Sequence, residues 1–196
     1  MTALHAQPHP QAITPWCDLA DRAEPEFRIQ WASDPWMDRQ AYALRRQVFC
    51  DEQALFVADD RDDIDRNEPT TRNLVALSCL AGQADELVGT VRIHRAAPGV
   101  WWGSRLAVQR DWRQHRRLGS SLIRLAVTSA HALGCEDFLA HVQAQNVPLF
   151  ERLHWQVLET RLLHGHPHAL MRADLAHYPP CATPYAGFVL TGGLPS

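Results

Sequence analysis

The segment from Leu106 to Leu122 constrains the fold of this chain more than any other. It reads as an apolar strand end, then an arginine-rich loop, then the start of an amphipathic helix. A helix N-terminus presents unpaired N–H groups and the positive end of the helix dipole, which suit a phosphate. Gly119 leaves room for a ligand near the backbone, and Arg113, Arg116 and Arg117 add charged donors. The segment predicts a phosphate-binding strand–loop–helix unit; a solvated basic loop is the alternative.

The charge distribution indicates a small anionic ligand rather than a polyanion. The 196 residues include 19 Lys and Arg against 22 Asp and Glu, which gives a formal net charge of −3. A protein that binds a nucleic-acid backbone usually carries a clear basic excess, so nucleic acid is not an expected partner. From Arg105 to Arg124, however, six arginines accompany only one acidic residue, Asp111. One compact basic segment in an acidic chain fits a phosphate-sized ligand.

Length, cysteines and hydropathy favour one cytoplasmic domain. A chain of this length that is 46% hydrophobic can bury a real core. The five cysteines, at positions 17, 50, 79, 135 and 181, are odd in number and scattered. That spacing is typical of free thiols in a reducing compartment. No basic region precedes an apolar run at the start of the chain, and no stretch approaches about 18 apolar residues. We therefore expect no signal peptide and no membrane span.

The expected elements follow the order β-α-β-β-β-α-β-α-β-β. Asp34 before Pro35 predicts a helix start, because a carboxylate caps the first turn and proline suits its first position. Residues 1–25 are expected to form a flexible arm, 26–175 one domain, and 176–196 a tail rich in Pro and Gly. The expected strands are 27–31, 73–80, 87–94, 100–108, 137–142, 155–164 and 168–174, and the expected helices are 34–49, 119–133 and 146–153, the last capped by Asn146.

The basic segment resembles the acyl-CoA-binding motif of the GCN5-related N-acetyltransferase (GNAT) superfamily. That motif reads Arg/Gln-x-x-Gly-x-Gly/Ala, and this chain has Arg116-Arg117-Leu118-Gly119-Ser120-Ser121. Downstream, the residues from Gln143 to Trp155 are similar to the family's Asn…Tyr-Glu-Lys-Leu-Gly-Phe segment. The resemblance implies an α+β fold with αβα layers, in which a mixed central sheet has one splayed strand pair. It also implies acetyl-CoA or another acyl-CoA as co-substrate.

The resemblance further implies which residues hold the CoA moiety. The loop and the helix N-terminus would bind the pyrophosphate, and the splayed strand would pair with the pantetheine arm. Phe150 is a departure, because many members have there a Tyr that protonates the leaving thiolate. The thiolate would then leave unassisted or take a proton from water, since a thiol has a pKa of about 8.5. Ser121 in place of Gly or Ala is a milder departure. The implied binding residues are Leu106, Ala107, Val108, Arg113, Arg116, Arg117, Leu118, Gly119, Ser120, Ser121, Asn146 and Phe150.

A second resemblance lies upstream. Leu44–Gln53, the acidic run 60–65 and Val88–Arg92 look like the N-terminal half of acyl-homoserine-lactone synthases and related N-acyltransferases of the same fold. More narrowly, the whole chain resembles the nitrogen-starvation-associated acetyltransferases. The implied reaction moves an acyl group, most simply acetyl, from acyl-CoA directly to a small-molecule amine. A longer-chain N-acyltransferase and a non-catalytic acyl-CoA sensor are the alternatives, and a homodimer is left open.

Acyl transfer to an amine requires a group that removes a proton, because an alkyl amine is mostly protonated near neutral pH. Many members of the family use a Glu on the strand before the loop, but Trp101–Arg105 contains no carboxylate. Glu52, just after the first helix, is one candidate for the catalytic base. His141, near the end of the strand after the long helix, is the other, because neutral imidazole suits this role. A solvated Glu and a packed His are the structural alternatives.

Two clusters of polar residues admit both a chemical and a structural interpretation. The carboxylates from Asp59 to Asp65 either attract a cationic amine or form a self-solvated loop, and their spacing is not that of a calcium-binding loop. His164, His166 and His168 alternate, but Gly165 and Pro167 favour a hairpin turn over a metal site. We therefore expect no metal.

Cys50 and the tryptophan pair also carry two interpretations. Cys50 is either an acyl-carrying nucleophile or a buried thiol. Trp101 and Trp102 point to opposite faces of one strand, so one is expected in the core and the other beside the acceptor.

Overall fold

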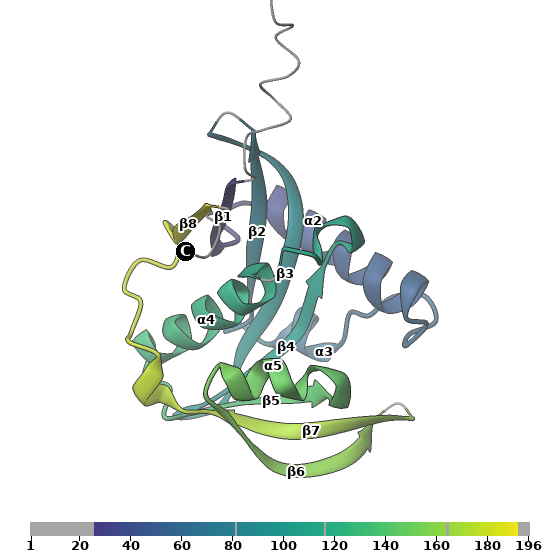
Figure 1. Ribbon diagram of the computed structural model, residues 1–196, viewed down its shortest axis with the longest axis vertical. Coiled ribbons are helices and arrows are strands. Elements are labelled where there is room, and N and C mark those ends of the chain that lie inside the picture. The colour runs from purple at the N-terminus through teal and green to yellow at the C-terminus, as the bar shows by residue number, and fades with distance from the viewer. Residues whose placement is uncertain (1–25, 81, 116, 164, 192–196) are drawn as a thin grey trace, which may run out of the picture.

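A mixed eight-stranded sheet organises the fold, with helices on both faces (Figure 1). The computed structural model describes residues 26–80, 82–115, 117–163 and 165–191. Side by side, the strands lie in the order β6-β7-β5-β4-β3-β2-β1-β8. Neighbouring strands are antiparallel, except that β4 and β5 are parallel. The α+β class expected from the resemblance is confirmed.

Most of the expected elements are present. Asp34 caps the first helix by accepting from the N–H groups of Trp36 and Met37 at 2.7 and 3.1 Å, as predicted. Asn146 precedes the last helix, but its side chain makes no capping hydrogen bond, so that detail was wrong. The strands are β1 Glu26–Trp31, β2 Arg72–Leu80, β3 Gln83–Ala97, β4 Val100–Val108, β5 Asp137–Gln143, β6 Trp155–Leu163, β7 His166–Ala173 and β8 Phe188–Thr191. The helices are α2 Pro35–Arg46, α3 Asp63–Asn67, α4 Arg117–Ala132 and α5 Val147–Arg152, with a π-helix over Gln47–Glu52 and 3₁₀ turns over Arg110–Trp112, Ala144–Asn146 and Leu175–His177.

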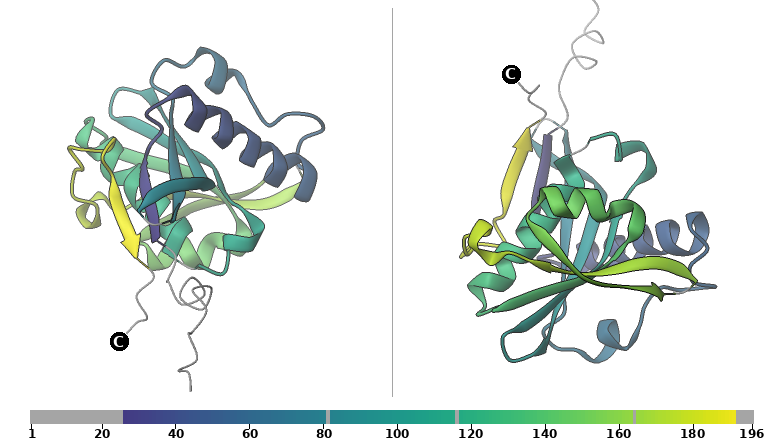
Figure 2. Two further views of the ribbon diagram at one scale, coloured as in Figure 1. Left: turned by 90° about the horizontal axis from the view of Figure 1, so that it is seen from above. Right: turned by 60° about the horizontal axis from the view of Figure 1, so that its bottom comes forward.

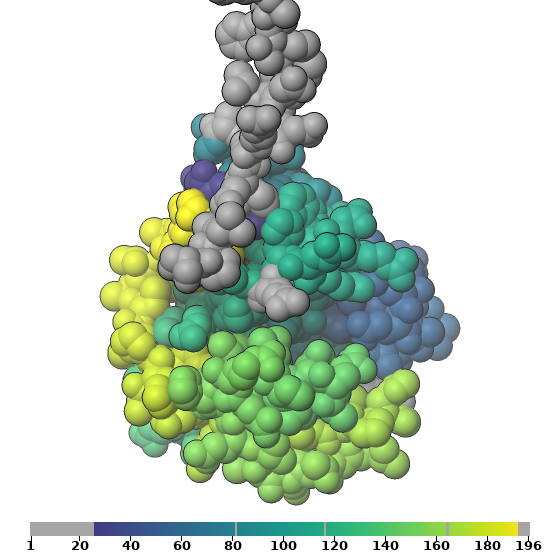
Figure 3. Space-filling view, in the orientation of Figure 1, coloured from purple at the N-terminus to yellow at the C-terminus, as the bar shows by residue number. Residues whose placement is uncertain are grey.

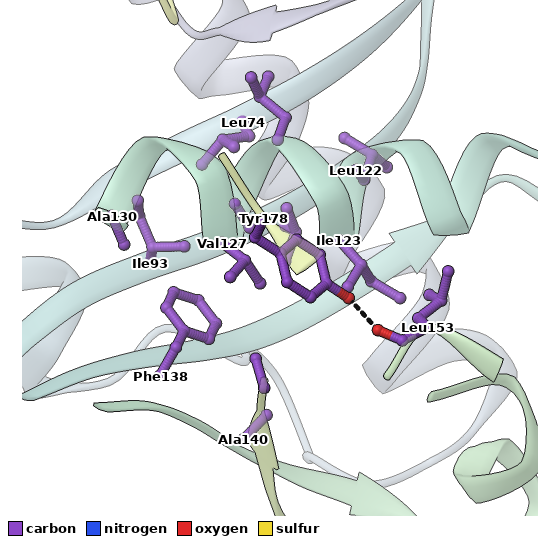
Figure 4. Close-up of a cluster of buried hydrophobic side chains, with 14 of the residues drawn as sticks. Leu74, Ile93, Leu122, Ile123, Val127, Ala130, Phe138, Ala140, Leu153 and Tyr178 are labelled. Carbon is purple, nitrogen blue, oxygen red and sulfur yellow. Dashed lines mark hydrogen bonds between the residues drawn. The ribbon is translucent and has the colours of Figure 1, made fainter. Parts of the chain in front are cut away.

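Side chains that alternate along the central strands pack into two separate cores. Leu74 and Ala76 of β2 join the larger core under α4, whereas Val75 and Leu77 join the smaller core under α2. α4 and α2 therefore cover opposite faces of the sheet (Figure 2). The larger core also contains Tyr178 from the C-terminal segment, beside residues of α4 and β5 (Figure 4).

β4 and β5 pair over their first residues and then separate. The parallel ladder ends at the pair Gly103–Ala140, whereas β4 continues to Val108 and β5 to Gln143. Arg105, just beyond the end of the ladder, has a left-handed backbone with φ 56°, and the register between β3 and β4 shifts there. A bulge of this kind bends its strand. The splayed strand pair is thus present, and it opens a space between β4 and β5.

The C-terminal segment adds structure where a tail was expected. Phe188–Thr191 forms β8, which pairs antiparallel with β1, so β1 lies inside the sheet. The chain before β8 is also held, because the N–H of Cys181 donates to the carbonyl of Thr128 at 2.9 Å. The sequence prediction failed here because β8 is short and finds its partner at the other end of the chain. The expected arm over residues 1–25 lies outside the described residues.

Candidate active site

A mostly apolar cavity of about 240 Å³ lies where β4 and β5 separate. Its walls come from both faces of the sheet. Ile123 of α4 and Phe150 of α5 line it on one face, and Phe49 and Phe56 line it on the α2 side. A ligand that enters beside α4 can therefore reach the opposite face of the sheet between the two strands.

His141 of β5 lies on the wall of this cavity. Its ring packs edge-on against Trp102, with 4.9 Å between the ring centroids. Its Nδ1 atom is buried and has no hydrogen-bond partner among the described residues. Burial lowers the pKa of this imidazole below its ordinary value of 6.5, and the charges of Arg161 and His168 lower it further. The ring is therefore mostly neutral at neutral pH, and one of its nitrogens can accept a proton.

A strip of amide and imidazole groups adjoins His141 in the cavity. Gln143 donates to the side chain of Gln53 at 3.3 Å, which joins β5 to the residue after the π-helix. His168 of β7 also lines the cavity, and its Nδ1 lies 2.9 Å from the carbonyl of His166. Sequence reasoning missed Gln53, Gln143 and His168 because they come from three separate elements. Strand alternation was the signal for Gln143, which shares a face of β5 with His141.

Glu52 and Arg113 form an ion pair at 2.6 Å. Arg113 also donates through Nε to the carbonyl of Val108 at 2.9 Å, so its guanidinium is held at the end of β4. Glu52 does not line the cavity formed by the described residues. The geometry favours a role for Glu52 in positioning Arg113, and its role as a base stays a prediction.

The first turn of α4 is open to solvent on one side. A Cβ added to Gly119 would meet no atom of another described segment within 4 Å, so a ligand can approach this turn. Ser120 donates its hydroxyl to the carbonyl of Arg117 at 3.0 Å. Leu118 is buried, and its N–H is already bonded to the preceding loop, so it packs the core beneath the turn. Arg116 lies outside the described residues.

The end of β4 has a free edge. Leu106 and Val108 are half-buried and Ala107 is buried. One side of this stretch pairs with β3, but within the described chain no strand pairs with the other side beyond Gly103. Apart from the carbonyl of Val108, which accepts from Arg113, this side of the strand can pair with an extended ligand, as in the addition of a strand to a sheet edge.

Among the described residues, no tyrosine lines the cavity in place of the missing one. Phe150 is buried and packs edge-on against Trp155, with 5.0 Å between the ring centroids. The hydroxyl of Tyr178 accepts from the indole N–H of Trp155 at 3.0 Å and donates to the carbonyl of Leu153 (Figure 4). Burial raises the pKa of this phenol, and Tyr178 does not line the cavity. Asn146 lies on the cavity wall together with Phe150.

The acidic segment holds an ion-pair cluster, which corrects both interpretations as an exposed loop for three of its five aspartates, while Asp59 and Asp63 are exposed. The Arg–Asp cluster consists of three arginines from α2, β3 and β4 and three aspartates from the segment before and within α3: Arg45, Arg92, Arg105, Asp60, Asp62 and Asp65. The charges balance, and the side chains of Arg45, Asp60 and Asp65 are fully buried. These aspartates therefore neutralise internal arginines instead of attracting a cationic acceptor.

Asp65 is the central carboxylate of the Arg–Asp cluster. It accepts from both terminal nitrogens of Arg45 at 2.8 Å and lies 2.7 Å from Arg92. Burial alone would raise the pKa of this carboxyl, but its bonds to Arg45 and the charges of Arg45 and Arg92 hold it well below its usual value. Arg105 connects the Arg–Asp cluster to the cavity, because it pairs with Asp60 at 2.9 Å and also lines the cavity wall. The cluster thus anchors the bulged part of β4.

The remaining candidates from the sequence are Cys50, the tryptophan pair and the alternating histidines. Burial raises the pKa of the Cys50 thiol, and Asp60 raises it further, so this cysteine is not an activated nucleophile. Trp101 is in the core, as expected for one of the pair, and Trp102 packs on His141. Of the alternating histidines, His164 lies outside the described residues. Within the part of the chain that the structure describes, no group of three His, Cys, Asp or Glu could hold a metal ion.

Comparison with known proteins connects this geometry to a family. The model of the acetyltransferase (GNAT) family matches residues 16–155. None of the curated proteins matches the chain significantly. No helix in the described ranges is long and apolar enough to cross a membrane.

Several solved structures share the fold. An acyl-CoA N-acyltransferase from Pseudomonas aeruginosa is 22% identical, with a TM-score of 0.61 over 76% of this chain and 98% of the other. FeeM, an N-acyl amino acid synthase from uncultured soil microbes, is 10% identical, with a TM-score of 0.62 over 79% and 93%. BjaI, a CoA-dependent acyl-homoserine lactone synthase solved with SAM and isopentyl-CoA, is 16% identical, with a TM-score of 0.56 over 78% and 86%. At these identities the likeness is one of fold.

Proposed function

The chain belongs to the GNAT acetyltransferase family, and on that premise we propose that it transfers an acyl group, first of all acetyl, from acyl-CoA to a small amine. Family membership supports N-acyl transfer in general terms. The narrower kinship with the nitrogen-starvation-associated group and the cytoplasmic location stay predictions.

The cavity between β4 and β5, with neutral His141 on its wall, is the observation that carries the proposal. The free edge of β4 leads to this cavity, and the open turn at Gly119 follows β4 in the chain. A thioester that lies along this edge would have its phosphate end at the helix N-terminus and its acyl end in the cavity. An amine on the α2 side could then meet the carbonyl carbon through the gap between the strands.

His141 is the proposed general base. The amine nitrogen attacks the thioester carbonyl carbon, a C–N bond forms, and His141 accepts the proton that the nitrogen loses. N–H groups on the free edge of β4 would stabilise the negative charge on the carbonyl oxygen. The C–S bond then breaks, and the thiolate leaves with its electron pair and takes a proton from water, because Phe150 has none to give. A general base of this kind contributes about 10²- to 10⁴-fold to the rate.

Arg113 and Arg117 are the proposed partners of the CoA pyrophosphate, together with the backbone of Gly119, Ser120 and Ser121. Arg113 is already paired with Glu52, so a phosphate has to compete with that carboxylate. Glu52 therefore affects CoA affinity in this proposal.

A longer acyl chain is the second candidate, favoured by the apolar lining of the cavity. A volume of about 240 Å³ is several times the roughly 30 Å³ of one water molecule. An acetyl group with the end of the pantetheine arm would fill only part of it. Phe138, Phe150 and Ile123 offer apolar contact to further methylene groups.

CoA release, measured by chromatography, tests the proposal. Acetyl-, butyryl- and octanoyl-CoA are each incubated with polyamines, amino acids and amino sugars, and binding is measured in parallel by calorimetry. Release with at least one amine supports N-acyl transfer, and release with octanoyl-CoA alone favours the second candidate. Binding without release for every pair would overturn the enzyme proposal in favour of an acyl-CoA sensor. Absence of binding would overturn both.

Matched variants test the base. His141→Gln should keep acyl-CoA binding and lose most of the turnover. His166→Gln is the control, because His166 is exposed on β7 and does not line the cavity. Equal turnover in the two variants would exclude His141 as the base.

A further inference from the structure

β6 is an edge strand, at the end of the sheet opposite β8. It runs along the lower margin of the molecule in Figure 1, and Figure 3 shows the β6–β7 hairpin at the surface there. Within the described chain, no strand pairs with its outer side. Three large apolar side chains on it are exposed: Val157 by 42%, Leu158 by 47% and Leu162 by 72%. A long edge strand with exposed apolar residues invites pairing with another chain.

The charges of β6 protect this edge weakly. Proteins commonly block such edges with lysine, proline or strong bulges. β6 contains neither lysine nor proline, and its one bulge lies at Leu158, where the register with β7 shifts. From Glu159 to Leu163 the ladder with β7 is regular. The charged residues of the strand are Glu159 and Arg161, which form an ion pair with each other.

The order of residues around Thr160 is self-complementary. It reads Leu158-Glu159-Thr160-Arg161-Leu162. Two copies of β6 can pair antiparallel about a two-fold axis perpendicular to the sheet. Residues that face each other across such a pair have their side chains on the same face of the sheet, and side chains alternate between faces along each strand. The axis must therefore pass beside a residue and not between two residues. With the axis at Thr160, Glu159 lies opposite the partner's Arg161, and Leu158 lies opposite the partner's Leu162.

Neighbouring registers lack this match. An axis at Glu159 places that carboxylate opposite its own copy, and an axis at Arg161 does the same with two guanidinium groups. Facing charges of like sign destabilise a strand pair, and facing charges of opposite sign stabilise it. The Thr160 register is therefore the one in which both charges and both leucines are matched.

We propose that the protein forms a two-fold dimer in which β6 pairs antiparallel with β6 of a second copy, with the axis at Thr160. A shallow groove of about 350 Å³, lined in part by Thr160, Leu162 and Ala169, flanks the strand and offers apolar surface to the partner. The dimer joins the two sheets into one and covers the exposed leucines. It does not depend on the acyl-transfer proposal.

Charge reversal and sedimentation equilibrium test the pairing. Glu159→Arg and Arg161→Glu each create facing like charges twice across the axis, so each should raise the dimer dissociation constant about tenfold or more. The double variant Glu159→Arg/Arg161→Glu restores opposite charges and should restore the dimer. A wild-type protein that stays monomeric, or a dimer insensitive to the single reversals, would overturn the proposal. So would a double variant that stays dissociated while folded, as judged by circular dichroism.

Cysteine cross-linking tests the register and works even if a charge variant folds poorly. Thr160→Cys places two thiols opposite each other at the axis, and mild oxidation should give a covalent dimer on a non-reducing gel. Gln156→Cys is the control on the same strand, because in the Thr160 register its thiol lies eight residue positions along the strand from the same thiol of the partner. The wild-type protein controls for its native cysteines. Equal cross-linking of the two variants would contradict the Thr160 register.

Discussion

Replacing Asp65 with asparagine removes one of the three negative charges from the Arg–Asp cluster and leaves three buried or half-buried arginines with two carboxylates. The side chain keeps its shape and one oxygen, so the change isolates the charge. Asp65 is fully buried, makes two bonds of 2.8 Å to Arg45 and lies 2.7 Å from Arg92. Water cannot replace these contacts without opening the fold between α2 and α3.

The size of the effect follows from this geometry. Breaking a buried ion pair by removing one partner costs about 3–5 kcal/mol, because the other charge is left uncompensated. Asparagine still accepts one hydrogen bond from Arg45, and Asp60 still faces Arg45 at 2.8 Å. We therefore expect a loss near the lower end, about 3 kcal/mol in the free energy of unfolding. That is a large share of the roughly 5–15 kcal/mol that stabilises a typical domain.

Urea unfolding at neutral pH, followed by circular dichroism, measures this loss. Asp63→Asn is the matched control, because Asp63 is on the same helix and its side chain is 92% exposed, with one distant ion pair at 3.7 Å. The control should unfold at the wild-type urea concentration. If Asp65→Asn lowers the free energy of unfolding by less than about 1 kcal/mol, the carboxylate of Asp65 is not needed to compensate the buried arginines, and the reasoning is refuted.

Three further outcomes follow from the site. The lowered pKa of His141 predicts that kcat/KM rises with pH through a midpoint below 6.5, because the base works when deprotonated, and a pH–rate profile with a higher midpoint would contradict this. Glu52→Gln removes the carboxylate that pairs with Arg113, in a surface ion pair worth up to about 1 kcal/mol. The Kd for CoA, measured by calorimetry, should therefore fall by about two- to fivefold, and kcat should change little. A large loss of kcat would instead identify Glu52 as the base. In Gly103→Ala the new Cβ would lie 2.9 Å from a ring carbon of Phe138. This crowding should cost about 1–3 kcal/mol in urea unfolding and weaken binding of octanoyl-CoA more than of acetyl-CoA, and wild-type values in both assays would contradict it.

Acid should destabilise the protein through the Arg–Asp cluster. The pKa of Asp65 is depressed in the folded state, so its stabilisation is present above the unfolded value of about 3.9 and is lost as the pH falls below it. In Asp65→Asn this part of the acid sensitivity should disappear, which urea unfolding between pH 5 and pH 3 would show.

Features with local signals were predictable from the sequence. The cap at Asp34 and the helix after the arginine-rich loop depend on residues within one or two turns of chain. Gly134 after that helix has φ 83°, the left-handed conformation that such a stop requires. For the same reason His141 could be placed near the end of its strand before its surroundings were known.

Features with distant partners were not predictable. The aspartates of the Arg–Asp cluster look like a solvated loop in sequence because their arginines come from α2, β3 and β4. The sequence around a buried aspartate looks the same as that around an exposed one, because the arginines that pair with it come from distant parts of the chain. The cavity likewise combines Gln53 and His168, which no local spacing connects. Two short elements, α3 and β8, were missed, and the assembly of the elements could not be predicted.

The pairing of β8 with β1 has a consequence for how the molecule is made. β1 is the first strand that the structure describes and β8 is the last, and they are neighbours in the sheet. At Gly187, just before β8, an added Cβ would collide with the carbonyl oxygen of Ile29, so the two segments touch closely. During synthesis one edge of β1 therefore stays unpaired until nearly all of the described chain has emerged from the ribosome. Contacts between residues this distant in sequence also form slowly. A nascent chain stalled before Phe188 would expose the unpaired edge of β1 to other protein chains. Pairing with β8, the last described strand, covers this edge.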